Sequence, residues 1–333
     1  MDLFKIISDI EQVDPEIYGR LDSRRRVFKH FGLAGKAVTA AMLPGLVSGL
    51  FQRAYGQGTT LSSNVQDVLN LALSLEYLEY YFYDSGLKVN GLIPQADRPA
   101  FEKIRNDESG HIAVLNAVPG FTNKIPDPTR AAFDYSGGKG TNAGPFAAAL
   151  VNDYALFLGS SQAFVDTGVR AYKGGAPTLI NNDDILESAL NIHSVEARHS
   201  SHVRTIRRGL AASQSGQAAT TVAADLANLS GKTGRPKSWI SGTDGGGPSP
   251  TTTPSTRPVY DAGTPATGPI TTLLFPAENN TTHNTTQAAI DLLTNTPGIT
   301  PAAASEAFDE PLDPATVKSI ARNFVVATST LFV

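Results

Sequence analysis

The chain has 333 residues, of which 41% are hydrophobic and 17% charged, with 27 Lys and Arg against 31 Asp and Glu. This length predicts one large domain or two modest ones, with enough apolar side chains to form a core. The net charge of −4 lacks the basic excess of nucleic-acid binders, so we expect no nucleic-acid partner. The absence of cysteine excludes disulfides, zinc–thiolate sites, iron–sulfur clusters and cysteine nucleophiles.

Residues 1–57 are typical of an export segment. Residues 23–29 read SRRRVFK and resemble the twin-arginine signal, and a weakly apolar stretch and the small-residue site Ala54-Tyr55-Gly56 follow them. The alternative is an ordinary basic amphipathic helix lying on the domain or on a membrane surface. We expect export to the periplasm or cell surface, with membrane contact of this segment before its cleavage. If the segment is no signal, we expect a cytoplasmic protein.

Residues 58–215 carry the helical periodicity of a four-helix domain. Apolar residues at steps of three and four predict helices over 63–85, 97–117, 145–172 and 183–212. A long connection rich in Pro, Gly and Asp separates the second helix from the third. A bundle with one long crossover at this place has ferritin-like connectivity, so the fold class we expect is all-α, a ferritin-like four-helix bundle.

The rest of the chain divides into a linker and a mostly irregular extension. Residues 216–260 are rich in Pro, Gly and Thr and predict a linker that need not pack. Residues 261–333 form the C-terminal extension, in which Asp313-Pro314 marks the start of a short terminal helix. This extension is either a small appended module or an arm that wraps the bundle.

Two helices of the bundle place ionisable residues on their apolar faces at the same spacing. Glu108 and His111 are three residues apart on the second helix, and Glu196 and His199 are three residues apart on the fourth. This step brings a carboxylate and an imidazole side by side, one turn apart, so that both can bind one metal ion. Di-iron and di-manganese carboxylate bundles use such a pair from each of two helices and one Glu from each of the other two.

The first helix adds carboxylates to the same pattern. Glu76 and Glu79 both lie on its apolar face, so this helix can add a carboxylate ligand to those of the other two. Carboxylate and imidazole ligands suit iron or manganese. The alternative is a buried polar network, in which each Glu accepts a hydrogen bond from a neighbouring His or from one of the tyrosines of the first helix.

Four motifs within residues 60–212 resemble those of the bacterial ferritin-like domain proteins often labelled desiccation-related. They are LEYLE at 75–79, DESGH at 107–111, DTGVRAYKGGAP at 166–177 and VEARH at 195–199. Residues 306–312, EAFDEPL, are similar to the tail of the longer members. The resemblance implies a ferritin-like bundle, export in many members, and a metal site at Glu76, Glu108, His111, Glu196 and His199. It implies no particular reaction.

One position departs from that family's pattern. Its members usually carry Glu on the third helix just before the Asp-x-Gly-Val run, where this chain has Val165. We therefore expect a single iron or manganese ion, or an asymmetric, weakly filled pair. Asp166, Gln162 or water would complete the ligand shell. His193 could donate a replacement nitrogen, although a partly exposed helix residue is the interpretation we favour.

Three classes of function stay open, so whether the chain is an enzyme is undecided. The first is an exported metal-dependent oxidase or a peroxide- and stress-protective protein. The second is a non-catalytic ferritin-like structural or assembly protein of the cell envelope with a degenerate site. The third is a simple metal-binding or storage protein. Besides the metal ion, the expected partners are further copies of the chain or an envelope assembly partner.

Overall fold

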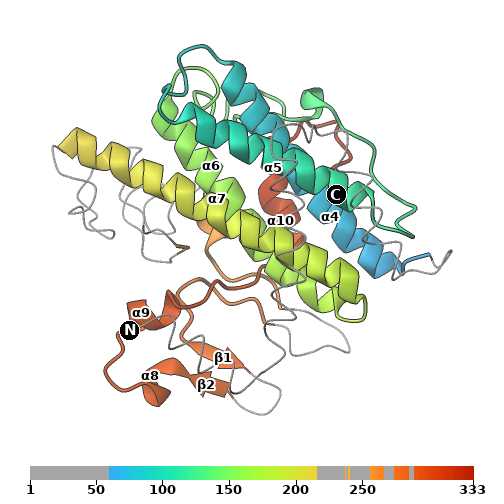
Figure 1. Ribbon diagram of the computed structural model, residues 1–333, viewed down its shortest axis with the longest axis vertical. Helices are drawn as coiled ribbons and strands as arrows, with labels where there is room; N and C mark the ends of the chain where they lie inside the picture. Colours follow the sequence, from blue (N-terminus) through green and yellow to red (C-terminus); the bar gives the residue numbers. More distant parts are fainter. Residues whose placement is uncertain (1–59, 216–236, 238, 241–255, 266–273, 285–288) are drawn as a thin grey trace, which may run out of the picture. The chain divides into compact units, whose positions relative to one another are not determined.

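Four long helices form the centre of the described part of the chain. A computed structural model describes residues 60–215, 237, 239–240, 256–265, 274–284 and 289–333. The predicted export segment and most of the predicted linker lie outside these residues. The four long helices are α4 (Ser63–Lys88), α5 (Arg98–Asn116), α6 (Tyr154–Gly175) and α7 (Asp183–Ser215) (Figure 1).

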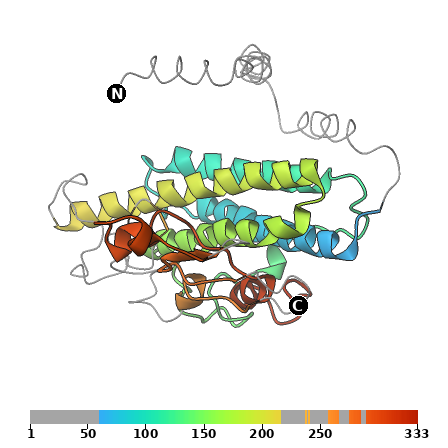
Figure 2. The same ribbon diagram turned by 90° about the horizontal axis from the view of Figure 1, so that it is seen from below.

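These helices pack as a bundle of two antiparallel pairs. Helix α4 packs along α5 and α6 packs along α7, while α4 also contacts α6 and α5 contacts α7 (Figure 2). Short connections join the helices of each pair, the second of them through a 3-10 turn at Ala176–Leu179. A long crossover, residues 117–153, joins α5 to α6. The predicted all-α bundle with ferritin-like connectivity is therefore confirmed.

The start of α6 differs from the prediction. Residues 145–153, which the periodicity assigned to the helix, form turns, and Val151 among them is 61% exposed. The helix begins at Tyr154 because Asp153 is its N-cap, with a side-chain oxygen 2.9 Å from the backbone nitrogen of Leu156. Helix α5 begins at Arg98, one residue after its predicted start. Asp97 occupies the N-cap position, but its carboxylate accepts a hydrogen bond from the Tyr154 hydroxyl at 2.7 Å instead.

The crossover is held by an aspartate and by the end of the chain. Asp134 is buried and accepts hydrogen bonds from three backbone N–H groups, those of Ser136, Gly140 and Asn142. Its own N–H donates to the carbonyl of Phe324 at 2.8 Å. The loop that separates the two helix pairs is therefore fixed by residues almost two hundred positions further along the chain.

The C-terminal part contains short elements. The described ones are β1 (Thr282–Asn284) and β2 (Ala289–Asp291), which pair antiparallel, and the helices α8 (Leu292–Asn295), α9 (Pro301–Ser305) and α10 (Pro314–Ala321). Further 3-10 turns lie at Arg130–Ala132, Arg257–Val259 and Arg322–Phe324. The predicted helix start is confirmed, because Asp313 caps α10 by accepting from the N–H of Thr316 at 2.9 Å. Helix α10 contacts α4 and α6.

We call the described residues from 256 onward the C-terminal arm, because the 3-10 turn at Arg257–Val259 and α10 both contact α6. The side chain of Arg170 on α6 is fully buried and donates to the arm's backbone carbonyls at Val259, Asp261, Pro276, Glu310 and Pro311. It also pairs with Glu278 at 2.8 Å. These contacts favour an arm that wraps the bundle over an independently appended module.

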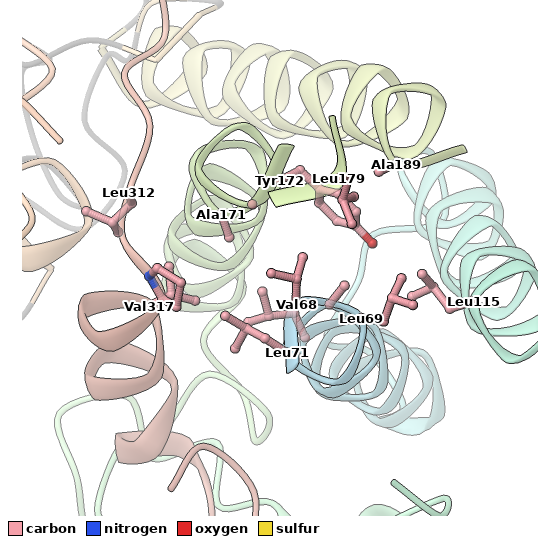
Figure 3. Close-up of a pocket in the computed structure, with 14 residues that line it drawn as sticks. Val68, Leu69, Leu71, Leu115, Ala171, Tyr172, Leu179, Ala189, Leu312 and Val317 are labelled. Atoms are coloured by element: carbon pink, nitrogen blue, oxygen red, sulfur yellow. The ribbon is translucent and has the colours of Figure 1, made fainter. Parts of the chain in front are cut away.

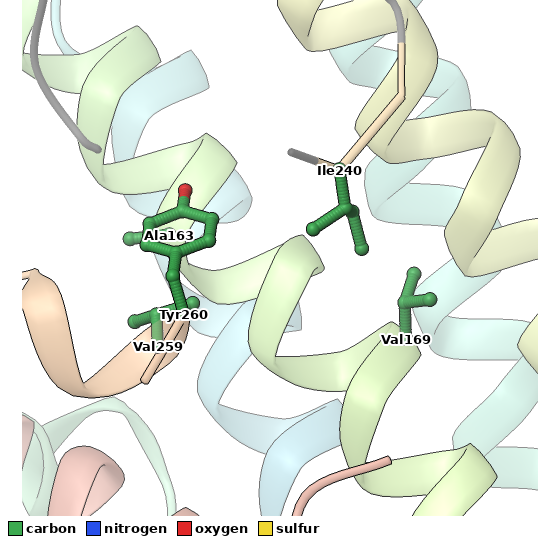
Figure 4. Packing of buried hydrophobic residues seen from close by; sticks show 5 residues of the cluster. All are labelled: Ala163, Val169, Ile240, Val259 and Tyr260. Carbon is green, nitrogen blue, oxygen red and sulfur yellow. The ribbon is translucent and has the colours of Figure 1, made fainter. Parts of the chain in front are cut away.

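Apolar packing accompanies these polar contacts. Val259 and Tyr260 of the arm join Ala163 and Val169 of α6 and Ile240 in one buried cluster (Figure 4). Within the described ranges, no helix is both long and apolar enough to cross a bilayer.

Candidate metal centre

Six buried ionisable side chains from three helices carry the candidate centre. They form three pairs with the same spacing of three residues, so the two members of each pair share one helix face. None of them is more than 6% exposed. The pairs are Glu76 and Glu79 on α4, Glu108 and His111 on α5, and Glu196 and His199 on α7.

The two histidines direct their Nδ1 atoms at these carboxylates. His111 Nδ1 lies 3.0 Å from Glu76 Oε2, 3.2 Å from Glu108 Oε2 and 3.1 Å from Glu196 Oε1. His199 Nδ1 lies 3.1 Å from Glu108 Oε1 and 3.7 Å from Glu196 Oε2. Glu108 and Glu196 thus each turn one oxygen toward each histidine. Ligand atoms of Glu76, Glu108, His111 and Glu196 all lie within 4.8 Å of one another.

Several of these atoms are buried without a hydrogen-bond partner in the described part of the chain. They are Glu79 Oε2, Glu108 Oε1, both carboxylate oxygens of Glu196, and His199 Nδ1. Glu108 Oε1 and His199 Nδ1 are close enough for a hydrogen bond, but their orientation does not form one. Buried carboxylate oxygens without partners are costly, and a cation among them removes that cost. The donor set therefore fits a metal ion.

Burial of several carboxyl groups close together raises the pKa values of two of them, Glu76 and Glu79. Burial raises the pKa of Glu76 to about 8, although the neighbouring His111 opposes the shift. Burial also raises the pKa of Glu79 well above its usual range, and the charges of Glu196 and Glu108 raise it further. Protons thus reside on carboxyl groups at neutral pH, and a divalent cation would displace them.

The pKa of His199 on α7 is raised by neighbouring carboxylates although burial lowers it. Burial by itself lowers the pKa of His199, but Glu196, Asp107 and Glu108 outweigh it and raise that pKa to about 12. Burial likewise raises the pKa of Glu196, but His199 and His111 outweigh it and lower that pKa to about 2.

Two further side chains hold the ligands in place. The Tyr172 hydroxyl on α6 donates a hydrogen bond to Glu76 Oε1. The Asp107 carboxylate lies 3.3 Å from His199 Nε2, on the side of the ring away from the cluster. A carboxylate at Nε2 fixes the tautomer that leaves Nδ1 with its lone pair free for a metal.

The expectation that Asp166 or Gln162 completes the ligand shell is corrected by the structure. Asp166 pairs with Arg204 and accepts hydrogen bonds from Ser200 at 2.7 Å and from Tyr260 at 2.6 Å. Gln162 donates to the same carboxylate and accepts from an arginine of α7. Since Asp166 lies one helical position beyond Val165, its side chain turns toward α7 and the arm, where it meets Arg204 and Tyr260.

Five of the predicted ligands lie together in the cluster, and the other candidate residues lie outside it. Glu76, Glu108, His111, Glu196 and His199 come together as the spacing indicates. Residue His193 is half-buried, in line with the favoured interpretation, and His202 is exposed. Val165 is fully buried and brings no carboxylate.

Glu79 is the residue that the ligand prediction left out. A Cβ atom built on Gly168 of α6 would lie 3.3 Å from Glu79 Oε1 and 3.7 Å from Glu196 Oε2. The absence of a side chain at Gly168 therefore leaves the space that the Glu79 carboxylate fills. Its position one turn from Glu76, on the same apolar face, was the feature of the sequence that could have identified it.

Comparison with known proteins locates this site within a family domain. Residues 64–208 match the family model described as a ferritin-like domain. Searches of curated proteins and of solved structures gave no match. The matched segment covers nearly all of the four long helices and contains all six residues of the cluster.

Proposed function

We propose that the ferritin-like domain at residues 64–208 holds a carboxylate–histidine centre for iron or manganese and uses it to react with dioxygen or peroxide. The observation that carries this proposal is the convergence of two imidazole Nδ1 atoms on buried carboxylate oxygens, several of which have no hydrogen-bond partner among the residues that the structure describes. Glu76, Glu108, His111, Glu196 and His199 would hold the metal. Oxygen and imidazole ligands suit both metals, which when bound would supply the redox chemistry.

The chain's own side chains exclude water and orient the ligands. Glu108 and Glu196 are almost inaccessible to solvent, at 0% and 1% exposure. Tyr172 holds one oxygen of Glu76 by its hydroxyl, so the second oxygen faces His111. Asp107 orients the ring of His199 from outside the cluster. Ligands fixed in this way need little rearrangement when a metal enters.

An apolar pocket supports a small, weakly polar reactant such as dioxygen. The pocket has a volume of about 30 Å³ and lies between α4, α6 and the C-terminal arm (Figure 3). Leu75, Leu115, Tyr172 and Val317 are among its lining residues. Tyr172 connects the pocket to the centre, since its ring lines the pocket and its hydroxyl bonds to Glu76. An apolar lining of this kind favours an apolar molecule over water.

A non-catalytic structural protein is the second candidate function. The hydrogen bonds that Glu76 accepts from Tyr172 and shares with His111 at 3.0 Å are those of a buried polar network without metal. In this case the same six residues would only stabilise the bundle, in an envelope or assembly role.

Metal analysis separates the two functions. Protein purified without chelators should contain iron or manganese, and Glu108→Ala or Glu196→Ala should remove most of it because each takes away a carboxylate shared between the histidines. His202→Ala is the matched control, because His202 lies on the same helix as Glu196 but is exposed, and it should leave the metal content unchanged. If the unmodified protein binds no transition metal, the structural function takes the place of the redox one.

A further inference from the structure

The cluster has two sides, each with its own histidine. On one side, His111 Nδ1 faces Glu108 Oε2 and Glu196 Oε1, with Glu76 beside it. On the other side, His199 Nδ1 faces the second oxygens of the same two carboxylates, Glu108 Oε1 and Glu196 Oε2. The first side thus has a histidine and a carboxylate of its own, and both sides share Glu108 and Glu196.

Helix α6 provides no carboxylate for the second side. Val165 is buried and apolar, Asp166 is paired with Arg204, and Gly168 has no side chain. A second ion beside His199 would then have one histidine and the two shared carboxylates, and it would lack a carboxylate equivalent to Glu76.

We propose that Glu79 of α4 supplies this missing carboxylate, so that the centre holds two ions with every protein ligand drawn from α4, α5 and α7. The assignment rests on the proposed metal function and makes it more specific. It replaces the single or weakly filled ion expected from the sequence with a full pair.

The position of Glu79 places its carboxylate on the correct side. The point where a Gly168 Cβ would lie is 3.3 Å from Glu79 Oε1 and 3.7 Å from Glu196 Oε2. Glu196 Oε2 is the oxygen that faces His199, whereas Glu196 Oε1 faces His111. Glu79 is 4% exposed, and its other oxygen, Oε2, is buried with no hydrogen-bond partner among the described residues.

The spacing on α4 lets one helix serve both sides. Glu76 and Glu79 are three residues apart, a separation of roughly 5–6 Å between Cβ atoms on one face of a helix. Their side chains therefore reach neighbouring points along the bundle axis. Gly168 on α6 leaves room for the Glu79 carboxylate, because a side chain at this position would occupy the space beside it.

Counting bound ions tests the assignment without reference to activity. The metal-free full chain is titrated with Mn²⁺, or with Fe²⁺ without oxygen, and the ions retained per chain are measured. We expect two ions in the unmodified protein and one in Glu79→Gln, which keeps the shape of the side chain but cannot become a carboxylate when a cation binds. Glu79→Ala should likewise retain one.

A double variant distinguishes loss of a ligand from loss of structure. In Glu79→Ala with Gly168→Glu, the new carboxylate starts from α6 beside the space that Glu79 vacates, and we expect the second ion to return. Two ions in Glu79→Gln, one ion in the unmodified protein, or no recovery in the double variant would overturn the assignment. An unmodified protein with no bound metal would instead overturn the proposed function.

Discussion

The protonation of single side chains in the cluster determines how the metal-free protein responds to pH. Glu76 has a folded-state pKa of about 8 against an ordinary value of 4.5, so the folded form holds a proton that the unfolded form loses. Its contribution to stability declines as pH rises from 4.5 to 8. His199, raised to about 12, adds stability that is complete below pH 6.5 and is lost as pH rises toward 12.

We therefore predict that the melting temperature of the metal-free protein falls between pH 5 and pH 8. Glu196, lowered to about 2, contributes stability that is lost only as pH falls from 4.5 to 2, so it does not oppose this trend. The measurement is thermal unfolding followed by circular dichroism after chelation, with Glu76→Gln as the control that should flatten part of the slope. Metal affinity should change in the opposite direction, because binding displaces protons. A metal-free protein that gains stability from pH 5 to pH 8 would contradict this prediction.

Five cluster residues could be predicted from sequence because helical spacing alone puts them on apolar faces. Asp166 was misassigned because its neighbours on α6 do not reveal the guanidinium of Arg204, which comes from another helix and pairs with it. Glu79 was left out because the space for its carboxylate depends on Gly168 of another helix. That the two residues lie close together is a feature of the tertiary structure. Spacing therefore identifies which residues share a face but not which contacts they make across the bundle.

At the level of elements, the helices were predicted well in their centres and less well at their ends. The start of α6 was placed too early because Phe146 and Ala149 in the preceding turns are buried and extend the apolar pattern. The cap at Asp153 decides the true start, since it satisfies an N–H that has no partner within the helix. Residues 145–153 thus contribute to the core without being helical.

Two helical glycines provide a matched test of how the arm lies on α6. A Cβ at Gly174 would clash with the carbonyl oxygen of Leu312 in the arm, whereas a Cβ at Gly110 of α5 has no atom of the described residues within 4 Å. We predict that Gly174→Ala destabilises the protein by about 1–3 kcal/mol, because the arm must shift. Gly110→Ala should stabilise it by about 0.5–1 kcal/mol, because alanine favours a helix more than glycine does.

Denaturant unfolding measures both substitutions. Equal effects of the two alanines would mean that the arm does not press on α6 at Gly174. Unchanged metal content in Gly174→Ala would confirm that the effect belongs to the arm and not to the centre.

At the scale of the whole molecule, Arg170 links the bundle to the arm. Its guanidinium is buried, and it pairs with Glu278, which is also buried. We predict that Arg170→Ala costs about 3–5 kcal/mol, because it leaves a buried carboxylate without its partner. The arm should then become more sensitive to proteases.

Limited proteolysis with mass spectrometry measures the change, with Arg257→Ala as control. Arg257 is exposed, and among the described residues its side chain pairs with nearby Asp261. Residues 241–255, where the sequence predicts a linker, lie outside the described residues, and cleavage there would report on the linker directly. An arm that stays resistant in Arg170→Ala would mean that other contacts hold it.

Export is the prediction that depends on the first part of the chain. Residues 1–57 lie outside the described residues, and the proposal rests on the motif at residues 23–29. Replacing Arg24 and Arg25 by Lys should leave the protein in the cytoplasm, and cell fractionation measures this. Normal export of the double variant would refute the twin-arginine assignment, whereas replacing Lys29 by Arg is the control that should have no effect.

The contacts of Arg170 also affect when the protein can finish folding during its synthesis. Arg170 and Glu310, whose carbonyl accepts its Nε–H, are 140 residues apart in the chain. At a synthesis rate of about 5–20 residues per second, the arginine emerges roughly 7–28 s before that acceptor. During this interval the acceptors of Arg170 in the arm are incomplete, since the Val259 carbonyl, 89 residues after the arginine, is made well before that of Glu310. The arm therefore completes its packing on α6 only after nearly the whole chain has been made. Chains that end before residue 310 lack the Glu310 and Pro311 carbonyls that accept from Arg170.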